Sequence, residues 1–136
     1  MASQRPAARP LSPHLSIWKW GPHMTVSILH RVTGSGMATV GSVLLVWWLA
    51  AIAGGAKSYA LFHFVFGEAL GGALGYIFGV GLTLSFFQHL ASGVRHFILD
   101  TGAGYELKGN KRGALATFVF SILATIIFWA FMLGAK

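Results

Sequence analysis

Residues 113–135 read GALATFVFSILATIIFWAFMLGA, without a single Asp, Glu, Lys or Arg. An α-helix needs about 20 mainly apolar residues to cross the hydrocarbon core of a bilayer, so this stretch is long enough. Two further uncharged stretches, 32–56 and 69–94, meet the same requirement. All three are apolar on every side rather than along one stripe, which favours contact with lipid. The sequence therefore predicts an all-α integral membrane protein with three transmembrane helices.

The composition of the whole chain agrees with a membrane location. Of its 136 residues, 55% are hydrophobic and 10% are charged, whereas a soluble domain carries about 25% charged residues. Three strands could not close a barrel, and an open strand edge is not stable in lipid. The chain has no cysteine, which excludes disulfides, cysteine-ligated iron–sulfur clusters and covalently attached c-type haem within it.

The apolar stretches also predict how the chain is organised. We expect one membrane-anchor domain over residues 1–136, with an arm over 1–24 and transmembrane helices over 25–56, 67–99 and 113–135. Two short links, 57–68 and 100–112, join the helices, and the second link is rich in glycine and polar residues. Glycines recur in the first helix, and in the second Gly67, Gly71, Gly75 and Gly79 repeat every four residues. Such small residues are typical of close helix packing and also leave room for a flat cofactor or a partner chain.

The positive charges predict the orientation in the membrane. The net charge is +7, and most Lys and Arg residues lie in the arm, at the border of the first helix, or in and just before the second link. Cytoplasmic loops carry such an excess, so we expect a cytoplasmic N-terminus and a C-terminus on the opposite side. The cations border apolar runs and form no basic face of a soluble domain, which argues against nucleic-acid binding.

The arm indicates the type of membrane. It contains neither the apolar core of a secretory signal nor the long Arg- and Ser-rich pattern of a transit peptide. We therefore expect a multi-pass protein of the bacterial cytoplasmic (inner) membrane, in contact with membrane lipid, although a processed mitochondrial chain would look the same.

Two polar clusters lie at the edges of the apolar stretches. Residues 27–34 read SILHRVTG and residues 89–100 read HLASGVRHFILD. The expected orientation brings both clusters to the same membrane face, where they can build one site. His89 lies deepest, roughly 8 Å inside its apolar stretch at 1.5 Å per residue, and His96 lies about 10 Å nearer the surface. An ionisable residue inside a membrane helix is a candidate functional group.

His89 is a candidate axial ligand of haem. A neutral imidazole is a good iron ligand, and Gly93, one turn further along the same face, removes a side chain where a porphyrin could lie. His30, Arg31, His96 and Arg95 lie nearer the surface, where haem propionates would need hydrogen bonds and positive charge. Because only one histidine is deep, a second ligand would have to come from another polypeptide. The alternative is that His89 only hydrogen-bonds a neighbouring helix.

Ser27 and Arg31 are candidate quinone-binding residues. They lie one turn apart at the membrane border and offer a hydroxyl and a cation to the carbonyl oxygens of a quinone. The alternatives are that Ser27 caps the helix and that Arg31 contacts lipid phosphate. The sequence contains no paired carboxylates, nucleophile triad or phosphate-binding loop, so nothing in it predicts hydrolysis or succinate oxidation by this chain alone.

Three motifs in order give the chain a resemblance to a known family. RPLSPHL at residues 9–15, SILHRVTG at 27–34, and the pattern His89-x3-Gly93-x-Arg95-His96-x3-Asp100 resemble the signatures of the succinate dehydrogenase cytochrome b subunit, the large membrane anchor of respiratory complex II, in its alpha-proteobacterial and mitochondrial form. The resemblance covers nearly the whole chain, including the three-helix layout.

The resemblance implies a role for each candidate residue. His89 matches the axial ligand of a single haem b; His30, Arg31 and His96 match positions near the haem propionates; Ser27 and Arg31 match ubiquinone-site residues. It also implies three partners: a companion small membrane-anchor subunit that supplies the second haem ligand, an iron–sulfur subunit and a flavoprotein subunit. Electrons from succinate would pass from the flavoprotein through the iron–sulfur subunit to ubiquinone.

Two other functions remain possible at this point. A quinol:fumarate reductase anchor would run the reaction in the opposite direction, which a sequence does not decide. A haem-free transporter or assembly scaffold belongs to another class, but inverted repeats and broken midplane helices, which are typical of transporters, are not evident.

Overall fold

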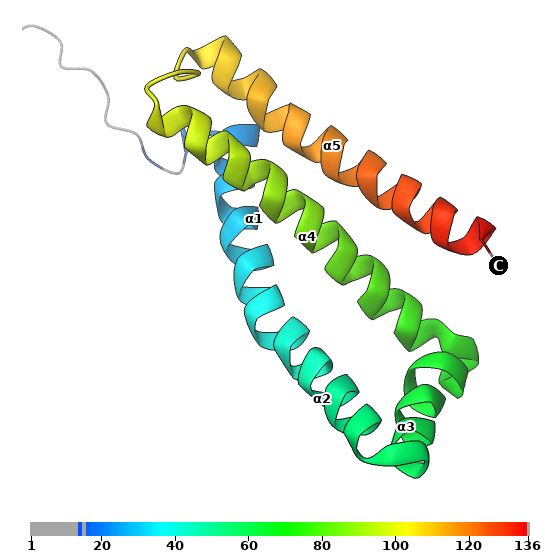
Figure 1. The fold of residues 1–136 in the computed structure, drawn as a ribbon. Helices are drawn as coiled ribbons and strands as arrows, with labels where there is room; N and C mark the ends of the chain where they lie inside the picture. Colours follow the sequence, from blue (N-terminus) through cyan, green and yellow to red (C-terminus); the bar gives the residue numbers. More distant parts are fainter. Residues whose placement is uncertain (1–13, 15, 136) are drawn as a thin grey trace, which may run out of the picture.

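The computed structural model describes residue 14 and residues 16–135, and the fold is all-α as predicted. Three helical segments are long and apolar enough to cross a membrane: Pro22–Ala53, Gly55–Asp100 and Leu107–Gly134. In Figure 1 the start of the first segment and the connection between the second and third lie at the same end of the molecule. Three of the positive charges behind the expected orientation lie outside the described residues: Arg5 and Arg9 of the arm and Lys136 of the tail.

The first segment consists of α1 (Pro22–Gly36), the π-helical turn η1 (Met37–Gly41) and α2 (Ser42–Ala53). Gly21 is the N-cap of α1 and Pro22 follows it at the first helical position, where a missing N–H costs nothing and the fixed φ suits a helix. The helix therefore starts before Ser27, which lies inside α1. The alternative that Ser27 serves as the helix cap was wrong.

The expected first link is itself largely helical. It forms α3 (Gly55–His63) and the π-helical turn η2 (Phe64–Glu68), followed by the 3-10 turn η3 (Ala69–Gly72). Within η3, Leu70, Gly71 and Gly72 all have positive φ. Two of these three residues are glycines, for which that conformation carries no steric penalty. The turn reverses the chain so that the following helix runs back alongside α1.

Two long helices complete the fold: α4 (Ala73–Asp100) and α5 (Leu107–Gly134). α5 packs along α4, and α1 contacts both. The first residues of α5, including Lys108 and Lys111, come from the expected polar link 100–112, so this helix begins before the uncharged stretch 113–135. At 1.5 Å per residue its 28 residues span about 42 Å, more than the roughly 30 Å of hydrocarbon.

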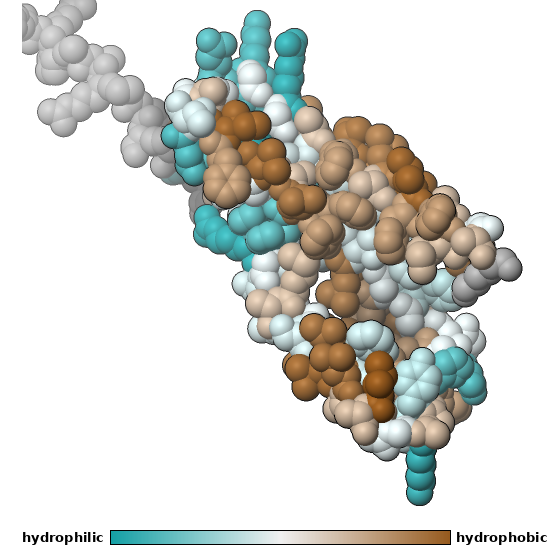
Figure 2. Space-filling view, viewed as in Figure 1, coloured by the Kyte–Doolittle hydropathy of each residue, from teal (hydrophilic) through white to brown (hydrophobic). Residues whose placement is uncertain are grey.

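The described surface is apolar to a degree that suits a membrane. Figure 2 shows hydrophobic surface over much of the middle and hydrophilic side chains at the two ends. Large side chains such as Val43, Ile77 and Ile127 are about two-thirds exposed within the isolated chain. The few buried polar side chains lie between helices instead: Thr33, Gln88, Ser92, Thr117, Ser121 and Thr125. This inside-out distribution is expected where lipid or partner helices replace water as the solvent.

Candidate functional site

Three histidines from two helices meet at the end of the molecule that carries the α4–α5 connection. The ring of His30 on α1 stacks on the ring of His89 on α4, with centroids 3.9 Å apart and planes 13° from parallel. The ring of His96 stands edge-on to His30, with centroids 5.0 Å apart. The two sequence clusters therefore form one site, although His30 and His89 are 59 positions apart in the chain.

Hydrogen bonds determine which nitrogen of His89 carries its proton. Nδ1 of His89 lies 3.0 Å from the backbone carbonyl oxygen of His30 and 3.3 Å from Oγ1 of Thr33. A carbonyl oxygen can only accept, so Nδ1 of His89 must be the donor. Nε2 of His89 then keeps its lone pair, and it has no hydrogen-bond partner among the residues that the structure describes.

A second chain of hydrogen bonds holds His30. Nδ1 of His30 lies 2.7 Å from Oγ of Ser92, and this hydroxyl lies 2.7 Å from the carbonyl oxygen of Gln88. Ser92 is completely buried. Gln88 in turn accepts a hydrogen bond at Oε1 from Ser121 on α5, at 2.8 Å. Polar contacts thus cross from α1 through α4 to α5 inside the apolar bundle.

A cavity of about 420 Å³ opens beside the histidines. It is lined by His30, His89, Leu90, Gly93, Val94, His96, Phe97 and Asp100. Several lining residues are largely exposed, Phe97 by 74%, so the part of the chain that the structure describes leaves the cavity open on one side. Gly93 lies on its wall, and a Cβ there would stand at an ordinary contact distance, 3.8 Å, from Cε1 of His30.

These residues fit one face of a haem b site. His89 presents a free Nε2 and anchors Nδ1 on a carbonyl, which is the arrangement that orients a histidine ligand towards a metal. Among residues 14 and 16–135, no cluster of three or more His, Cys, Asp or Glu could hold a metal ion by itself. A haem iron needs only axial ligands from protein, because the porphyrin supplies the other four.

The two quinone candidates lie near the histidines but outside their cavity. Ser27 and Arg31 both belong to α1, one turn apart. Ser27 is half-buried and Arg31 is exposed, and neither lines the cavity beside His89. Neither side chain forms a hydrogen bond or an ion pair within the described part of the chain, so the hydroxyl of Ser27 and the guanidinium of Arg31 are available to a ligand.

Arg95 points elsewhere than the sequence suggested. Its guanidinium donates to Oδ1 of Asn110 on α5, and it lines a different, apolar cavity between α4 and α5. The cavity beside His89 does not include it. Arg95 therefore connects the start of α5 to the end of α4. Four residues were expected near the haem propionates, and two of them, His30 and His96, line the histidine cavity.

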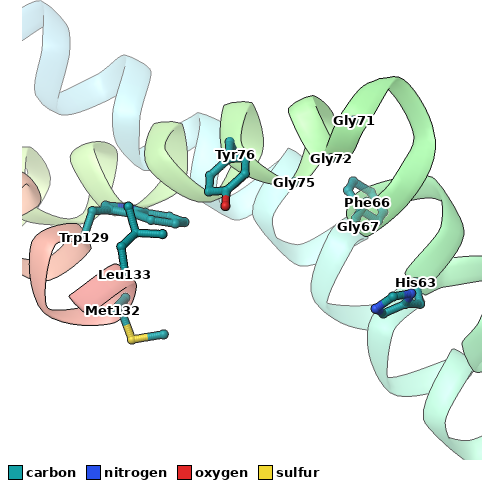
Figure 3. A pocket seen from close by; sticks show the side chains of 10 residues that line it. All are labelled: His63, Phe66, Gly67, Gly71, Gly72, Gly75, Tyr76, Trp129, Met132 and Leu133. Carbon is teal, nitrogen blue, oxygen red and sulfur yellow. The ribbon is translucent and has the colours of Figure 1, made fainter. Parts of the chain in front are cut away.

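A further cavity, of about 410 Å³, lies at the opposite end of the helices, beside η2 and η3. Figure 3 shows His63 from α3, Tyr76 from α4 and Trp129 from α5 around it, with four glycines on its wall. His63 pairs through Nδ1 with Oε1 of Glu68 at 3.1 Å, and both are more than half exposed. The distance from the histidine cluster makes this a separate feature.

Sequence reasoning missed the residues that hold the histidines in place. Thr33, Gln88 and Ser92 were not singled out, although each contacts His30 or His89 or lies next to one of them. A signal was present: Gln88 and Ser92 are polar residues one helical turn apart inside an apolar stretch, as are Thr117, Ser121 and Thr125 on α5. Such spacing places polar groups on one face, where they can bond a neighbouring helix.

Comparisons with known proteins identify the family of the chain. Residues 5–128 match the family described as "Succinate dehydrogenase/Fumarate reductase transmembrane subunit". The chain is 31% identical to the succinate dehydrogenase cytochrome b556 subunit of Paracoccus denitrificans, over 96% of this chain and all of the relative. It is 35% identical to the corresponding subunit of Rickettsia felis, over 89% of this chain and 90% of the relative. With the mitochondrial cytochrome b560 subunit of Mus musculus it shares 36% identity, over 86% of this chain and 68% of the relative.

Proposed function

Because the chain belongs to the succinate dehydrogenase/fumarate reductase transmembrane subunit family, we propose that it binds haem b through His89 and helps form a ubiquinone-reduction site. Its relatives are cytochrome b subunits of succinate dehydrogenase, and the three apolar helices make it a multi-pass inner-membrane protein. The resemblance to this family seen in the sequence is thus confirmed.

One observation carries the haem proposal: the hydrogen bond from Nδ1 of His89 to the carbonyl oxygen of His30. It fixes the neutral tautomer in which Nε2 is the metal-binding nitrogen. A haem held there supplies one-electron oxidation and reduction. The protein residues orient and shield the imidazole, since Nδ1 is bonded to a backbone carbonyl and the His30 ring covers one of its faces.

His30 and His96 are proposed to bind the anionic edge of the haem. Both line the cavity beside His89. An imidazole N–H of His96 can donate a hydrogen bond to a propionate carboxylate, whereas Nδ1 of His30 is bonded to Ser92, so the His30 ring lines the rim without donating from that nitrogen. Arg31 follows His30 on α1 and is exposed, so its long side chain can bring a cation to the same rim.

Ser27 and Arg31 are proposed to bind the ubiquinone carbonyl oxygens. Both are unengaged donors on one face of α1, and both lie outside the haem cavity, so the quinone would have a place of its own beside it. Their position near the end of the helix gives access to protons from water.

The proposal requires partners. A succinate dehydrogenase subunit works with a flavoprotein, which oxidises succinate, and an iron–sulfur subunit, which passes the electrons on. This chain would take no part in succinate oxidation itself. The exposed lining of the histidine cavity supports a companion small membrane subunit that covers the haem and supplies the second axial ligand.

We propose that the arm and the α4–α5 connection face the cytoplasm and that the C-terminus lies on the opposite side. The start of α1, which follows the arm, and the α4–α5 connection lie at the same end of the molecule (Figure 1). The connection and the adjoining start of α5 carry Lys108, Lys111 and Arg112, and such basic segments favour the cytoplasmic side.

Haem measurement on the purified complex tests the proposal. His89→Ala should abolish the b-type absorbance in a pyridine haemochrome assay, while subunit masses show that the complex still assembles. His63→Ala is the matched control, because His63 lies at the opposite end of the molecule and is exposed; it should keep a full haem content. An assembled His89→Ala complex with undiminished haem would refute the ligation.

The family description also covers fumarate reductase. The relatives described above are all succinate dehydrogenase subunits, which favours succinate oxidation as the direction. No observation favours a haem-free transporter or scaffold.

A further inference from the structure

The hydrogen bond from Nδ1 of His89 to the His30 carbonyl oxygen does not by itself fix the plane of the His89 ring. The contacts of Nδ1 with the His30 carbonyl oxygen and with Oγ1 of Thr33 both position one atom of the imidazole, and the ring can still turn about that atom. The plane of the ring is restrained by something else: the His30 imidazole, which lies 13° from parallel at a centroid distance of 3.9 Å. The plane of His89 therefore depends on what holds His30.

Ser92 is the residue that holds the His30 ring. Its hydroxyl lies 2.7 Å from both the Gln88 carbonyl oxygen and Nδ1 of His30. The hydroxyl has one proton, and carbonyl oxygens can only accept, so the proton points to the Gln88 carbonyl oxygen, with the His89 carbonyl oxygen 3.1 Å away as a second acceptor. Nδ1 of His30 must then donate to Oγ of Ser92. This assignment satisfies all three groups with good geometry and leaves no buried polar atom of Ser92 unpaired.

The contact is also well shielded. Ser92 has no exposed surface, so water does not compete for its hydroxyl. The carbonyl to which it donates belongs to the residue before His89, so Ser92 connects the backbone at the base of His89 with the ring that covers it. His96, edge-on to His30, closes a further side of the same ring.

We infer that Ser92 is a positioning residue that sets the plane of the His89 imidazole through His30. The inference rests on the proposed haem ligation by His89. Ser92 itself lines none of the cavity beside the histidines, so it would act on a bound haem only through the orientation of the ligand. A serine that merely packed α4 into the bundle would not affect ligand orientation.

Electron paramagnetic resonance of the oxidised complex tests this inference, because the g values of a low-spin ferric haem depend on the orientation of its axial imidazole planes. Ser92→Ala should shift or broaden the signal of largest g, while haem content and subunit stoichiometry stay at the wild-type level. Thr83→Ala is the matched control: the Thr83 hydroxyl donates to the Gly79 carbonyl oxygen at 2.7 Å, on the same helix, but contacts no histidine. It should leave the signal unchanged.

A second comparison asks whether Ser92 acts through His30. In a His30→Ala background, Ser92→Ala should produce no further change of the signal. A wild-type signal in Ser92→Ala, or a full effect in the absence of the His30 ring, would overturn the inference. Should the alanine variant fail to accumulate, Ser92→Cys decides, since a thiol fills similar space but is a weak hydrogen-bond acceptor; a wild-type signal there also overturns it.

Failure of this inference can be told apart from failure of the proposed function. If His89→Ala loses haem and Ser92→Ala keeps the wild-type signal, only the positioning role is wrong. If His89→Ala keeps haem, the ligation is wrong and the positioning role falls with it.

Discussion

The ring of His89 occupies the space into which a side chain on Gly34 would project. An ideal Cβ on Gly34 would stand 2.7 Å from Cε1 and 3.2 Å from Nδ1 of His89, closer than non-bonded carbon atoms approach. The absence of a side chain on α1 is thus what lets the imidazole lie against the backbone and donate to the His30 carbonyl oxygen. Close approach to a backbone is a common reason for glycine inside a helix.

Gly34→Ala is therefore expected to displace the His89 ring and break its hydrogen bond at Nδ1. We expect a lower haem content or a shifted b-type absorbance in the purified complex, because losing the hydrogen-bond partner of a metal-binding histidine lowers metal affinity by about 10–100-fold. Gly36→Ala is the control, since a Cβ at Gly36 meets no atom within 4 Å. Equal haem spectra for the two variants would contradict the expected clash.

Ser121→Ala should destabilise the bundle by removing the partner of a buried amide. Oε1 of Gln88, a residue only 4% exposed, accepts from Ser121 at 2.8 Å. Interhelical hydrogen bonds in membranes contribute about 0.6 kcal/mol on average and up to about 1.7. Thermal unfolding of the complex in detergent measures the loss, with Ser42→Ala, at an exposed site on α2, as the control.

The double variant Gln88→Leu with Ser121→Ala should recover much of that loss. Replacing both partners with apolar groups removes the unpaired amide, whereas removing one leaves it buried. A double variant that is less stable than the sum of both single changes would show that the pair is not coupled in this way.

Arg31→Gln and Ser27→Ala should impair quinone reduction selectively. A hydrogen bond from a charged donor contributes about 1.5–3 kcal/mol, so we expect Arg31→Gln to lower kcat/KM for ubiquinone roughly 10- to 100-fold, with a smaller loss for Ser27→Ala. Succinate oxidation assayed with an artificial acceptor that bypasses the membrane subunits should be unaffected. Wild-type kinetics in both variants would place the quinone elsewhere.

The orientation can be tested with engineered thiols, because the chain has no cysteine of its own. Tyr105, in the α4–α5 connection, and Tyr59, on α3 at the other end, are both exposed and make a matched pair. In intact spheroplasts an impermeant maleimide should label Tyr59→Cys, and Tyr105→Cys should react only after the membrane is opened. The reverse pattern would invert the proposed topology.

By itself, the sequence determined the number of membrane-spanning helices and the two clusters that form the site. Lipid offers no hydrogen bonds, so each uncharged stretch of sufficient length must be helical, and this holds whatever its neighbours do. His30, His89 and His96 could be predicted to meet because both clusters border the same membrane face. The sequence did not reveal that residues 57–68 are helical, because Lys57 and Glu68 interrupt the uncharged stretches, and such charges mark the end of an apolar run without deciding whether the helix continues.

Only the tertiary structure decided which groups hold the histidines. The stack of His30 on His89, the bond of His30 to Ser92 and the turn of Arg95 towards Asn110 all depend on how α1 and α5 are rotated about α4. That rotation follows from close packing at small residues such as Gly34. Helical periodicity in the sequence specifies which residues share a face of one helix, but it does not specify which residues of a neighbouring helix lie opposite that face. Spacing along a chain identifies candidate ligands, whereas their tautomers and ring planes are properties of contacts between helices.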